Sequence, residues 1–204
     1  MSPTGTAAYL AWGDLPPAVA KAVDLARRLD FANSSLPAHG ELLRLLARGV
    51  GAGIIGETGT GCGVGLAWLA TGAHPGARLV SIERDAERAA AAALLFEDDP
   101  RVRVCQGDWR ELAAYARFDL LVLDGGGTGK RGAGHREPPL DPLAWVRPGG
   151  LIVIDDFTPS VEWPPTHEGV VDTVRLFWLE HPNLRSAQLT LAPGAATIVA
   201  TVVG

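Results

Sequence analysis

Cysteine is scarce in this chain, because Cys62 and Cys105 are the only two among 204 residues. Two cysteines cannot build a disulfide framework or a four-cysteine zinc site. Long apolar runs are also missing: a run such as 151–154 is far short of the roughly 20 residues that cross a membrane. The N-terminus has no charged segment followed by an apolar one, so no secretory signal is predicted. These absences favour a cytoplasmic protein in a reducing compartment.

An excess of basic residues is absent as well. Lys and Arg number 18 and Asp and Glu 23, which gives a formal charge of −5 and a pI near 5.5. A protein that binds a polyanion needs a basic surface, so nucleic acid is not an expected partner. Hydrophobic residues make up 47% of the chain, which excludes a disordered protein. The length predicts a single domain over residues 1–204.

Short apolar segments alternate with segments of helical periodicity along most of the chain. Residues 1–14 have no period and are expected to form a loose arm, 15–48 two N-terminal helices, and 49–204 the core. Such alternation predicts right-handed crossovers and a parallel sheet covered on both faces. Strands are predicted at 53–57, 78–83, 102–105, 118–124 and 151–155, and helices at 16–29, 38–47, 64–70, 85–96, 110–116 and 140–146.

The C-terminal part departs from this alternation. A helix is predicted over 170–181, and two strands follow it at 186–191 and 196–203, joined by the turn 192–195. Two strands joined by a short turn with Pro and Gly indicate an antiparallel hairpin. The expected fold class is therefore α/β: a Rossmann-like, doubly wound, mostly parallel seven-stranded sheet with a C-terminal antiparallel hairpin.

The segment richest in chemical information is 57–65, with the sequence ETGTGCGVG. It follows the first predicted strand and precedes a helix, which is where open parallel sheets bind ligands. Glycines there allow the backbone to approach a ligand closely. Glu83 ends the second predicted strand, where an acid can accept both ribose hydroxyls of a nucleoside. A glycine-rich turn without a ligand is the alternative.

The glycine spacing also bears on the kind of ligand. Gly59, Gly61 and Gly63 are spaced G-x-G-x-G, whereas a dinucleotide site prefers G-x-G-x-x-G. Glu57 opens the motif, and a carboxylate is a poor neighbour for a pyrophosphate at a helix N-terminus. A carboxylate suits a cationic ligand that carries an ammonium and a sulfonium group. The pattern therefore disfavours a nicotinamide dehydrogenase.

Several motifs, taken in order, resemble those of the class I S-adenosylmethionine-dependent methyltransferases, and more narrowly the small O-methyltransferases of the catechol O-methyltransferase type. The resemblance runs from about residue 36 to the C-terminus. It rests on 36–43 (LPAHGELL), 57–63 (ETGTGCG), 107–109 (GDW), 118–124 (FDLLVLD) and 147–156 (RPGGLIVIDD). It implies S-adenosylmethionine as the cofactor of a cofactor-binding core at 49–204. It also leaves a homodimer open, through apolar faces of the helices before the first motif.

The resemblance assigns cofactor-binding roles residue by residue. The methionine end falls to Glu57 and the turn that follows it. The ribose falls to Glu83, with Arg84 beside it, and the adenine to Asp108 and Trp109. The implied cofactor set is Glu57, Gly59, Gly61, Cys62, Gly63, Glu83, Arg84, Asp108, Trp109 and Asp124.

The resemblance also raises a metal site. In the metal-dependent branch of the family, an acid after the fourth strand and a consecutive Asp-Asn after the fifth bind a divalent cation. The matching positions here are Asp124, Asp155 and Asp156, and the last departs from the usual Asn. Asp is an equally hard oxygen ligand, so Mg²⁺ or another divalent cation is a candidate. The alternative is that these acids bind no metal and instead cap the next segment or hydrogen-bond cofactor and acceptor directly.

The family's lysine, three residues past the strand-four acid, is missing, because Gly127 stands at that position. Lys130 is the only lysine nearby, in a glycine-rich loop at 125–138 that we expect to form a lid. Lys130 or His135 is the candidate base, with a solvated loop position as the alternative for each. The candidate catalytic residues are Asp124, Lys130 and Asp155.

Two further segments bear on the acceptor side of the site. Residues 157–168, which include Trp163 and His167, are expected to line the acceptor pocket, or else to pack as a plain loop over the sheet edge. His39, before the first motif, is interpreted as a helix cap.

The predicted function is S-adenosylmethionine-dependent transfer of a methyl group to an oxygen of a small-molecule acceptor, with metal assistance left open. Neither nucleic acid nor membrane is an expected partner. One alternative is a metal-independent small-molecule methyltransferase. Another is a non-catalytic S-adenosylmethionine-binding module, which the missing lysine at position 127 favours.

Overall fold

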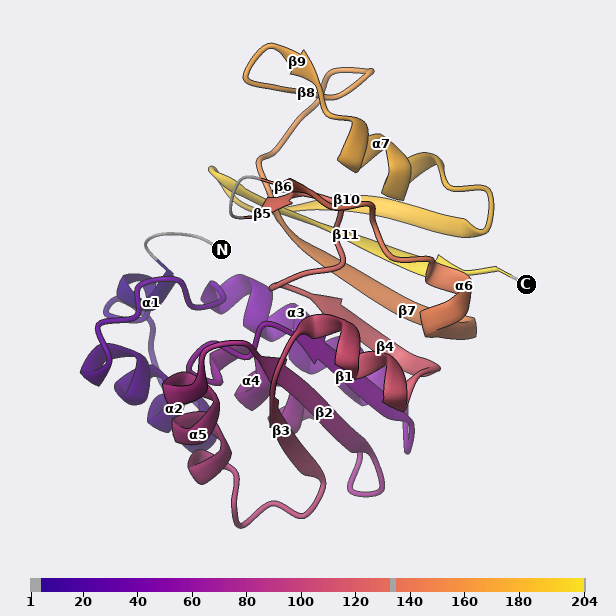
Figure 1. Cartoon of the computed structure of the whole chain (residues 1–204). Helices are drawn as coiled ribbons and strands as arrows, with labels where there is room; N and C mark the ends of the chain where they lie inside the picture. The colour runs from indigo at the N-terminus through magenta and orange to yellow at the C-terminus, as the bar shows by residue number, and fades with distance from the viewer. Residues whose placement is uncertain (1–4, 133–134, 204) are drawn as a thin grey trace.

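The computed structural model describes residues 5–132 and 135–203, except for the side chains of residues 131–136. Figure 1 shows one sheet with helices on both of its faces. The strands of the main sheet are β1 (Ile54–Thr58), β2 (Arg78–Glu83), β3 (Val102–Gln106), β4 (Phe118–Leu123), β7 (Val146–Phe157), β10 (Leu184–Ala192) and β11 (Ala195–Val202). Two small hairpins pair β5 (Arg131–Gly132) with β6 (His135–Arg136), and β8 (Thr166–His167) with β9 (Val170–Val171).

The main sheet has the strand order β10-β11-β7-β4-β1-β2-β3. The five strands from β7 to β3 are paired in parallel, whereas β11 is antiparallel to both of its neighbours, β7 and β10. The predicted fold class is therefore confirmed. From β1 the chain first builds outward through β2 and β3 and then returns to build β4 and β7 on the other side. This reversal opens a crevice at the carboxyl ends of β1 and β4, where ligands of open α/β sheets bind.

Helices cover the sheet according to the alternation of its side chains. Leu120 and Val122 of β4 pack toward one cluster, and Leu121 and Leu123 toward the other. The first face carries α2 (Pro17–Arg28), α3 (Pro37–Gly49), α4 (Val64–Gly72) and α5 (Ala86–Leu95). The second carries η1 (Trp109–Tyr115), a 3-10 helix, together with α6 (Pro142–Trp145) and α7 (Thr173–Glu180).

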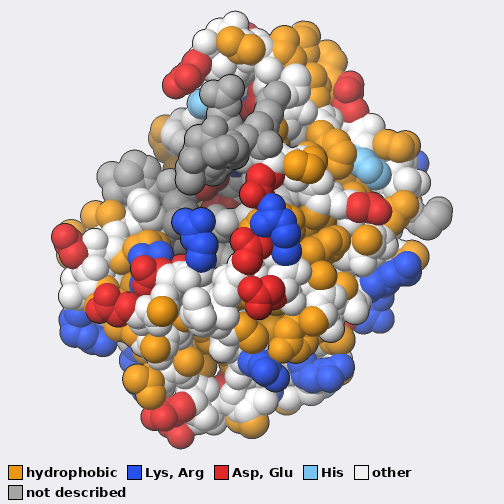
Figure 2. Space-filling view, in the orientation of Figure 1, with side chains coloured by type: hydrophobic (Ala, Val, Ile, Leu, Met, Phe, Trp, Pro, Cys, Tyr) orange, Lys and Arg blue, Asp and Glu red, His pale blue; other side chains and the backbone are white. Residues whose placement is uncertain are grey.

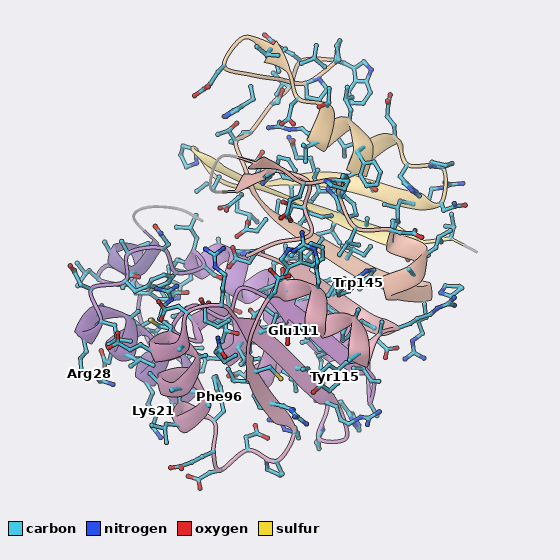
Figure 3. The ribbon with its side chains drawn as sticks, in the orientation of Figure 1. Lys21, Arg28, Phe96, Glu111, Tyr115 and Trp145 are labelled. Atoms are coloured by element: carbon cyan, nitrogen blue, oxygen red, sulfur yellow. The ribbon has the colours of Figure 1, made fainter. Side chains whose placement is uncertain are left out.

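Figure 3 separates the two helical layers by their labelled side chains, with Glu111, Tyr115 and Trp145 on the η1 and α6 side and Lys21 and Arg28 on α2. Every residue of β4 is buried, as expected for a central parallel strand with both faces covered. Among the described residues, none of the helices combines the length and the hydropathy of a membrane span.

The N-terminal segment, expected to be a loose arm, is packed in part. Gly5–Ala8 form the short helix α1, and Tyr9 is only 3% exposed. The Tyr9 hydroxyl donates to the carbonyl of Ser35 at 2.8 Å and accepts from the indole nitrogen of Trp68 at 2.9 Å. Side-chain hydrogen bonds to residues far along the chain hold this segment, and local periodicity carries no trace of them.

Two predicted helices are shorter than expected. The helix predicted over 170–181 begins only at Thr173, because Val170 and Val171 pair as strand β9. Asp172 caps the helix, since its side chain accepts from the backbone nitrogen of Arg175. The helix predicted over 140–146 spans only Pro142–Trp145, and strand β7 already begins at Val146 rather than at residue 151.

We expect Gly40→Ala to destabilise the protein. A methyl group at Gly40 would lie 2.2 Å from the indole nitrogen of Trp68, which is fully buried between α3 and α4. Overpacking of this kind costs about 1–3 kcal/mol. Urea denaturation measures the change. The control is Gly49→Ala in the same helix, where a methyl group meets nothing within 4 Å; it should stabilise the helix slightly. Equal effects of the two substitutions would contradict the packing argument.

Candidate active site

The glycine turn after β1 adopts a backbone that other residues rarely adopt. Gly59, Gly61 and Gly63 have φ angles of +87°, +54° and +86°. A methyl group on Gly59 would lie 2.6 Å from the Cα of Gly125, the residue after Asp124 in the next loop. The two loops at the switch point therefore touch through glycine backbone, and this contact forms one wall of the crevice.

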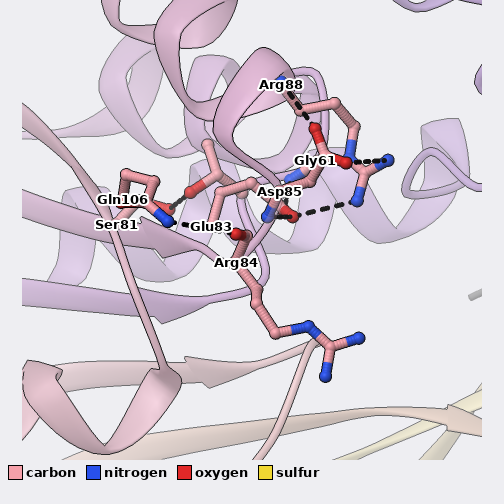
Figure 4. A network of polar contacts seen from close by, with 8 residues as sticks. Gly61, Ser81, Glu83, Arg84, Asp85, Arg88 and Gln106 are labelled. Carbon is pink, nitrogen blue, oxygen red and sulfur yellow. Dashed lines mark hydrogen bonds and ion pairs between the residues drawn. The ribbon is translucent and has the colours of Figure 1, made fainter. Parts of the chain in front are cut away.

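Glu83 ties the end of β2 to the glycine turn (Figure 4). Its Oε2 accepts from the backbone nitrogen of Gly61 at 2.8 Å. Its Oε1 accepts from the backbone nitrogen of Asp85 at 2.9 Å and from Arg88 at 3.1 Å. An ionised carboxyl group offers about four acceptor positions, so these three donors leave capacity for a ligand hydroxyl. Glu83 and Arg84 both line the crevice.

Glu57 is buried beneath the turn and does not line the main cavity. Its Oε2 accepts from the Ser81 hydroxyl at 2.6 Å. A methyl group at Gly65 would lie 2.6 Å from the other oxygen of Glu57, so the carboxyl group lies directly under the start of α4. Burial raises the pKa of Glu57 to about 8; the Ser81 hydrogen bond opposes this rise, and the nearby charges of Asp124 and Glu83 add to it.

Cys62, in the same turn, is fully buried, and burial raises the pKa of its thiol to about 11. The thiol therefore stays neutral, and Cys62 packs in the turn as a small hydrophobic side chain.

Asp108 and Trp109 follow β3 and line the same crevice. The Asp108 side chain caps η1 by accepting from the backbone nitrogen of Arg110 at 3.0 Å, and Glu111 completes the capping box. The Trp109 indole lies against backbone, because a methyl group at Gly126 would be 2.3 Å from its Cδ1. Trp109 and the loop after β4 are therefore in direct contact.

Two cavities meet at the candidate catalytic residues. The first, of about 590 Å³, extends from Glu83 and Trp109 to Asp124. The second, of about 420 Å³, lies between the start of α3 and the β10–β11 turn and is lined by Leu36 and Leu191 among others. The residues that line both cavities are Lys130, Asp155 and Asp156. A ligand in each cavity would thus meet the other at these groups.

The neighbouring acids at the end of β7 reach the same place because the strand is irregular there. Asp155 and Asp156 together stand opposite the single residue Thr197 of β11, which is a β-bulge. Neighbouring residues of a regular strand point to opposite faces, and a bulge re-aims them. Asp156 has a φ of +67°, a conformation that Asp and Asn tolerate better than other side chains.

Asp124, Asp155 and Asp156 each offer an oxygen, and these oxygens all lie within 4.8 Å of one another. Burial and, after it, the nearby Asp155 carboxylate raise the pKa of Asp124 to about 7, although His39 and Lys130 oppose this rise. Oδ1 of Asp124 is buried without a hydrogen-bond partner among the described residues. Hard carboxylate oxygens around a buried, unsatisfied acceptor fit a divalent cation or a ligand ammonium group. The residues present therefore fit the predicted metal.

Lys130 lies inside the site and not in solvent. Its Nζ is 2.5 Å from the backbone carbonyls of both Asp155 and Asp156 and 3.7 Å from the ring centre of Phe157. Burial lowers its pKa to about 8, although nearby acids oppose this shift. The side chain of His135, the other candidate base, lies outside the described part of the chain.

Hydrogen bonds connect the loop that carries Lys130 to other parts of the fold. The Trp178 indole nitrogen donates to the carbonyl of Thr128 at 2.8 Å, and the carbonyl of Gly127 accepts from the backbone nitrogen of Leu140 at 2.9 Å. These contacts hold Lys130 at the junction of the two cavities. Movement of residues 125–138 as a lid stays a prediction.

His39, interpreted from sequence as a helix cap, is instead a buried residue of the site. It is 1% exposed, and its Nδ1 lies 3.1 Å from Oδ2 of Asp155. Burial lowers its pKa, but the Asp155 carboxylate and, more weakly, Asp124 raise it, and the net shift is upward. One sequence signal was available: His39, Leu43 and Ala47 are spaced by four residues and form one buried helix face.

Residues 157–168 contribute less to the second cavity than predicted. Only Phe157 and Thr158 line it, whereas Trp163 is 65% exposed and His167 also faces solvent. Figure 1 shows the β8–β9 hairpin projecting beyond α7, away from β1 and β4. The prediction that Trp163 and His167 line the pocket was therefore wrong, because this segment extends outward as a hairpin.

The surface seen in Figure 2 has acidic and basic side chains mixed across its middle, so no single sign of charge dominates that face of the molecule.

Comparison with known proteins agrees with this geometry. Residues 57–157 match the family model described as a methyltransferase domain. A protein from Mycobacteroides abscessus, described as an O-methyltransferase by inference, is 33% identical over 145 residues, which cover 66% of this chain and 61% of the relative. A relative from Mycobacterium sp. strain JLS with the same description is 31% identical over 130 residues, which cover 60% of this chain and 57% of the relative. The match thus spans only part of the length of these curated relatives.

Solved structures share the fold over nearly the whole chain. The O-methyltransferase TomG from Streptomyces achromogenes, crystallised with S-adenosylmethionine, has a TM-score of 0.70 at 24% identity and covers 98% of this chain and 96% of its own. An O-methyltransferase from Bacillus cereus, in complex with S-adenosylhomocysteine, has a TM-score of 0.70 at 20% identity, with 97% and 96% covered.

The strand order, the glycine turn and the family match together indicate the class that the chain resembles: residues 57–157 are similar to a methyltransferase domain, and the sheet has the Rossmann-like fold of the methyltransferase structures compared. Within that class, the proteins that it resembles are O-methyltransferases.

We expect Glu57→Gln to remove a pH-dependent loss of stability. With a pKa of about 8 in the folded chain and 4.5 as its ordinary value, Glu57 binds more protons when folded than when unfolded. Its contribution to stability is therefore lost as pH rises from the ordinary value through 8. One pKa unit corresponds to about 1.4 kcal/mol, so the loss is on the order of a few kcal/mol. Denaturant unfolding of the ligand-free protein between about pH 5 and pH 8.5 measures it.

The control is Glu97→Gln, which removes the same charge from an exposed position. Its stability should follow the wild-type pH dependence. If the wild-type and Glu57→Gln curves stay parallel over the whole range, Glu57 is not the group responsible.

Proposed function

We propose that this protein transfers the methyl group of S-adenosylmethionine to an oxygen of a small-molecule acceptor, with a divalent cation held by Asp124, Asp155 and Asp156. The observation that carries the proposal is the meeting of two cavities at Lys130, Asp155 and Asp156. The larger cavity has the acidic and aromatic lining of a nucleoside site. The smaller one is the proposed acceptor site.

The donor side is proposed from the side chains that line the larger cavity. Glu83 has acceptor capacity left for ribose hydroxyls, and Trp109 offers a flat ring for a base. Asp124, whose Oδ1 has no hydrogen-bond partner within the described part of the chain, would face the ammonium end of the donor. Acids at both ends of a cavity favour a cationic donor over an anionic dinucleotide.

The chemistry of the reaction sets what the chain must provide. S-adenosylmethionine, when bound, supplies a methyl group that is already electrophilic on its sulfonium. A divalent cation, when bound, would lower the pKa of the acceptor hydroxyl and so favour its deprotonation. The protein's own residues must hold the acceptor oxygen in line with the methyl group, at about 3–3.5 Å. Lys130, whose Nζ lies at the junction and whose pKa is lowered by burial to about 8, is the proposed group that orients the acceptor and, as the neutral amine, takes its proton to become the ammonium.

A metal-independent reaction is the second candidate, and one observation favours it. Lys130 donates a hydrogen bond to the backbone carbonyl of Asp155, and the His39 ring contacts the Asp155 carboxylate. These two groups already bring positive charge or donors to the acids without any ion.

We further propose that the protein works in a reducing cytoplasm. The support is that both of its cysteines, Cys62 and Cys105, are free thiols.

Glu83→Gln should weaken S-adenosylmethionine binding by roughly 10–100-fold, because a hydrogen bond to a charged group contributes about 1.5–3 kcal/mol. Isothermal titration calorimetry measures the affinity, and thermal unfolding checks that the glycine turn still folds. Glu97→Gln serves as the control and should bind like the wild type. Heat with NADH but none with S-adenosylmethionine would refute the proposed donor.

Position 156 offers a matched pair of variants for the metal. Asp156→Asn restores the residue usual in the resembled family and tolerates the positive φ, so it should keep stimulation by Mg²⁺. Asp156→Ala loses the ligand oxygen and should lose at least about tenfold of that stimulation. Transfer of a radiolabelled methyl group to a panel of vicinal dihydroxyphenols, with Mg²⁺ or with EDTA, is the assay. Full activity in EDTA would establish the metal-independent alternative.

A further inference from the structure

His39 lies beside a close contact between two helices. It lies in the first turn of α3, beside Gly40, whose backbone lies against the Trp68 indole of α4. Its ring is 1% exposed, so neither nitrogen is free to turn toward bulk water. A side chain fixed in this way can fix the group that it contacts.

That group is Asp155, which lies far from His39 along the chain but next to it in space. Nδ1 of His39 lies 3.1 Å from Oδ2 of Asp155, which is an ion-pair contact without the angle of a hydrogen bond, and Lys130 lies at 2.5 Å from the backbone carbonyl of the same residue. The strand end is held as well, because the Thr197 hydroxyl donates to the carbonyl of Ile154 at 2.9 Å. Asp155 is therefore contacted at its side chain, its own carbonyl and the carbonyl before it.

A purely structural role for His39 fits these observations less well. His39 lines the 420 Å³ cavity together with Lys130, Asp155 and Asp156, so it belongs to the wall of the site and not only to the core. A carboxylate in a β-bulge is less constrained by its own strand than one in a regular ladder. It needs an external partner to keep one orientation.

We propose that His39 is a positioning residue that orients the Asp155 carboxylate by engaging Oδ2, which leaves the second oxygen for a divalent cation. This inference rests on the cation site of the proposed function and adds a residue that the family resemblance does not assign. Partners that orient metal-binding side chains typically change metal affinity by about 10–100-fold when removed.

The test uses two amide variants that differ in where the nitrogen lies. Asn places its amide nitrogen as many bonds from Cα as Nδ1 of His, and Gln places its amide nitrogen as many bonds away as Nε2. His39→Asn should therefore keep a donor toward Asp155, and His39→Gln should lose it. Titration of each protein with MnCl₂, followed by the electron paramagnetic resonance signal of free Mn²⁺, measures the affinity without any turnover.

We expect His39→Asn to bind Mn²⁺ within about threefold of the wild type and His39→Gln to bind roughly 10–100-fold more weakly. Affinity for S-adenosylmethionine, measured by calorimetry, should be unchanged in both. In an Asp155→Asn background, His39→Gln should have no further effect on Mn²⁺ affinity, since the partner is already lost.

Three outcomes would overturn the inference. If both variants bind Mn²⁺ like the wild type, His39 does not position Asp155, and the proposed function stands. If His39→Gln loses S-adenosylmethionine and Mn²⁺ binding together, its role is structural. If the wild type itself binds no Mn²⁺ while it binds S-adenosylmethionine, the cation site and the role of His39 fail together, and the methyl-donor site remains.

Discussion

The contact between Gly59 and Gly125 is the constraint on which the site depends. These residues begin the loops after β1 and β4, the strands between which the chain reverses direction. A methyl group on either would lie within 2.6 Å of the other's backbone, so any larger side chain would force the loops apart. With the loops in contact, Asp124 lies beside the glycine turn, and one crevice serves both strands. The larger cavity is thus a direct result of backbone packing between two glycines.

A second irregularity, the bulge at Asp155 and Asp156, brings the chemistry to the end of that crevice. It directs neighbouring side chains of one strand to one place, where they meet Asp124. Three acids in such proximity would repel one another if all were ionised and unpaired. Lys130 and His39 lessen this repulsion, since Lys130 contacts the backbone carbonyl of Asp155 and His39 contacts its carboxylate. The acids can therefore stay close together in the folded chain.

The sequence predicted the sheet and its crossovers, because hydrophobic periodicity over short stretches of the chain indicates the strands and helices. It also predicted the glycine turn, because several glycines close together after a strand are typical of a ligand-binding turn. It did not place His39, whose partner Asp155 lies far along the chain; only the spacing of His39, Leu43 and Ala47 hinted at a buried face. The late start of α7 was readable in retrospect, since Asp172 is a good N-cap and the valines before it favour strands. Long-range side-chain contacts, such as those of Tyr9, leave no local pattern to read.

The position of β11 has a consequence for how the protein is made. This strand is the last of the sheet along the chain, yet it lies between β7 and β10 and not at an edge. Until Ala195–Val202 have emerged from the ribosome, one side of β7 stays unpaired, and its apolar residues Ile152 and Ile154 have no neighbour there. Open strand edges of this kind recruit other chains. Nascent chains that pause before residue 195 are therefore the ones most in need of chaperones.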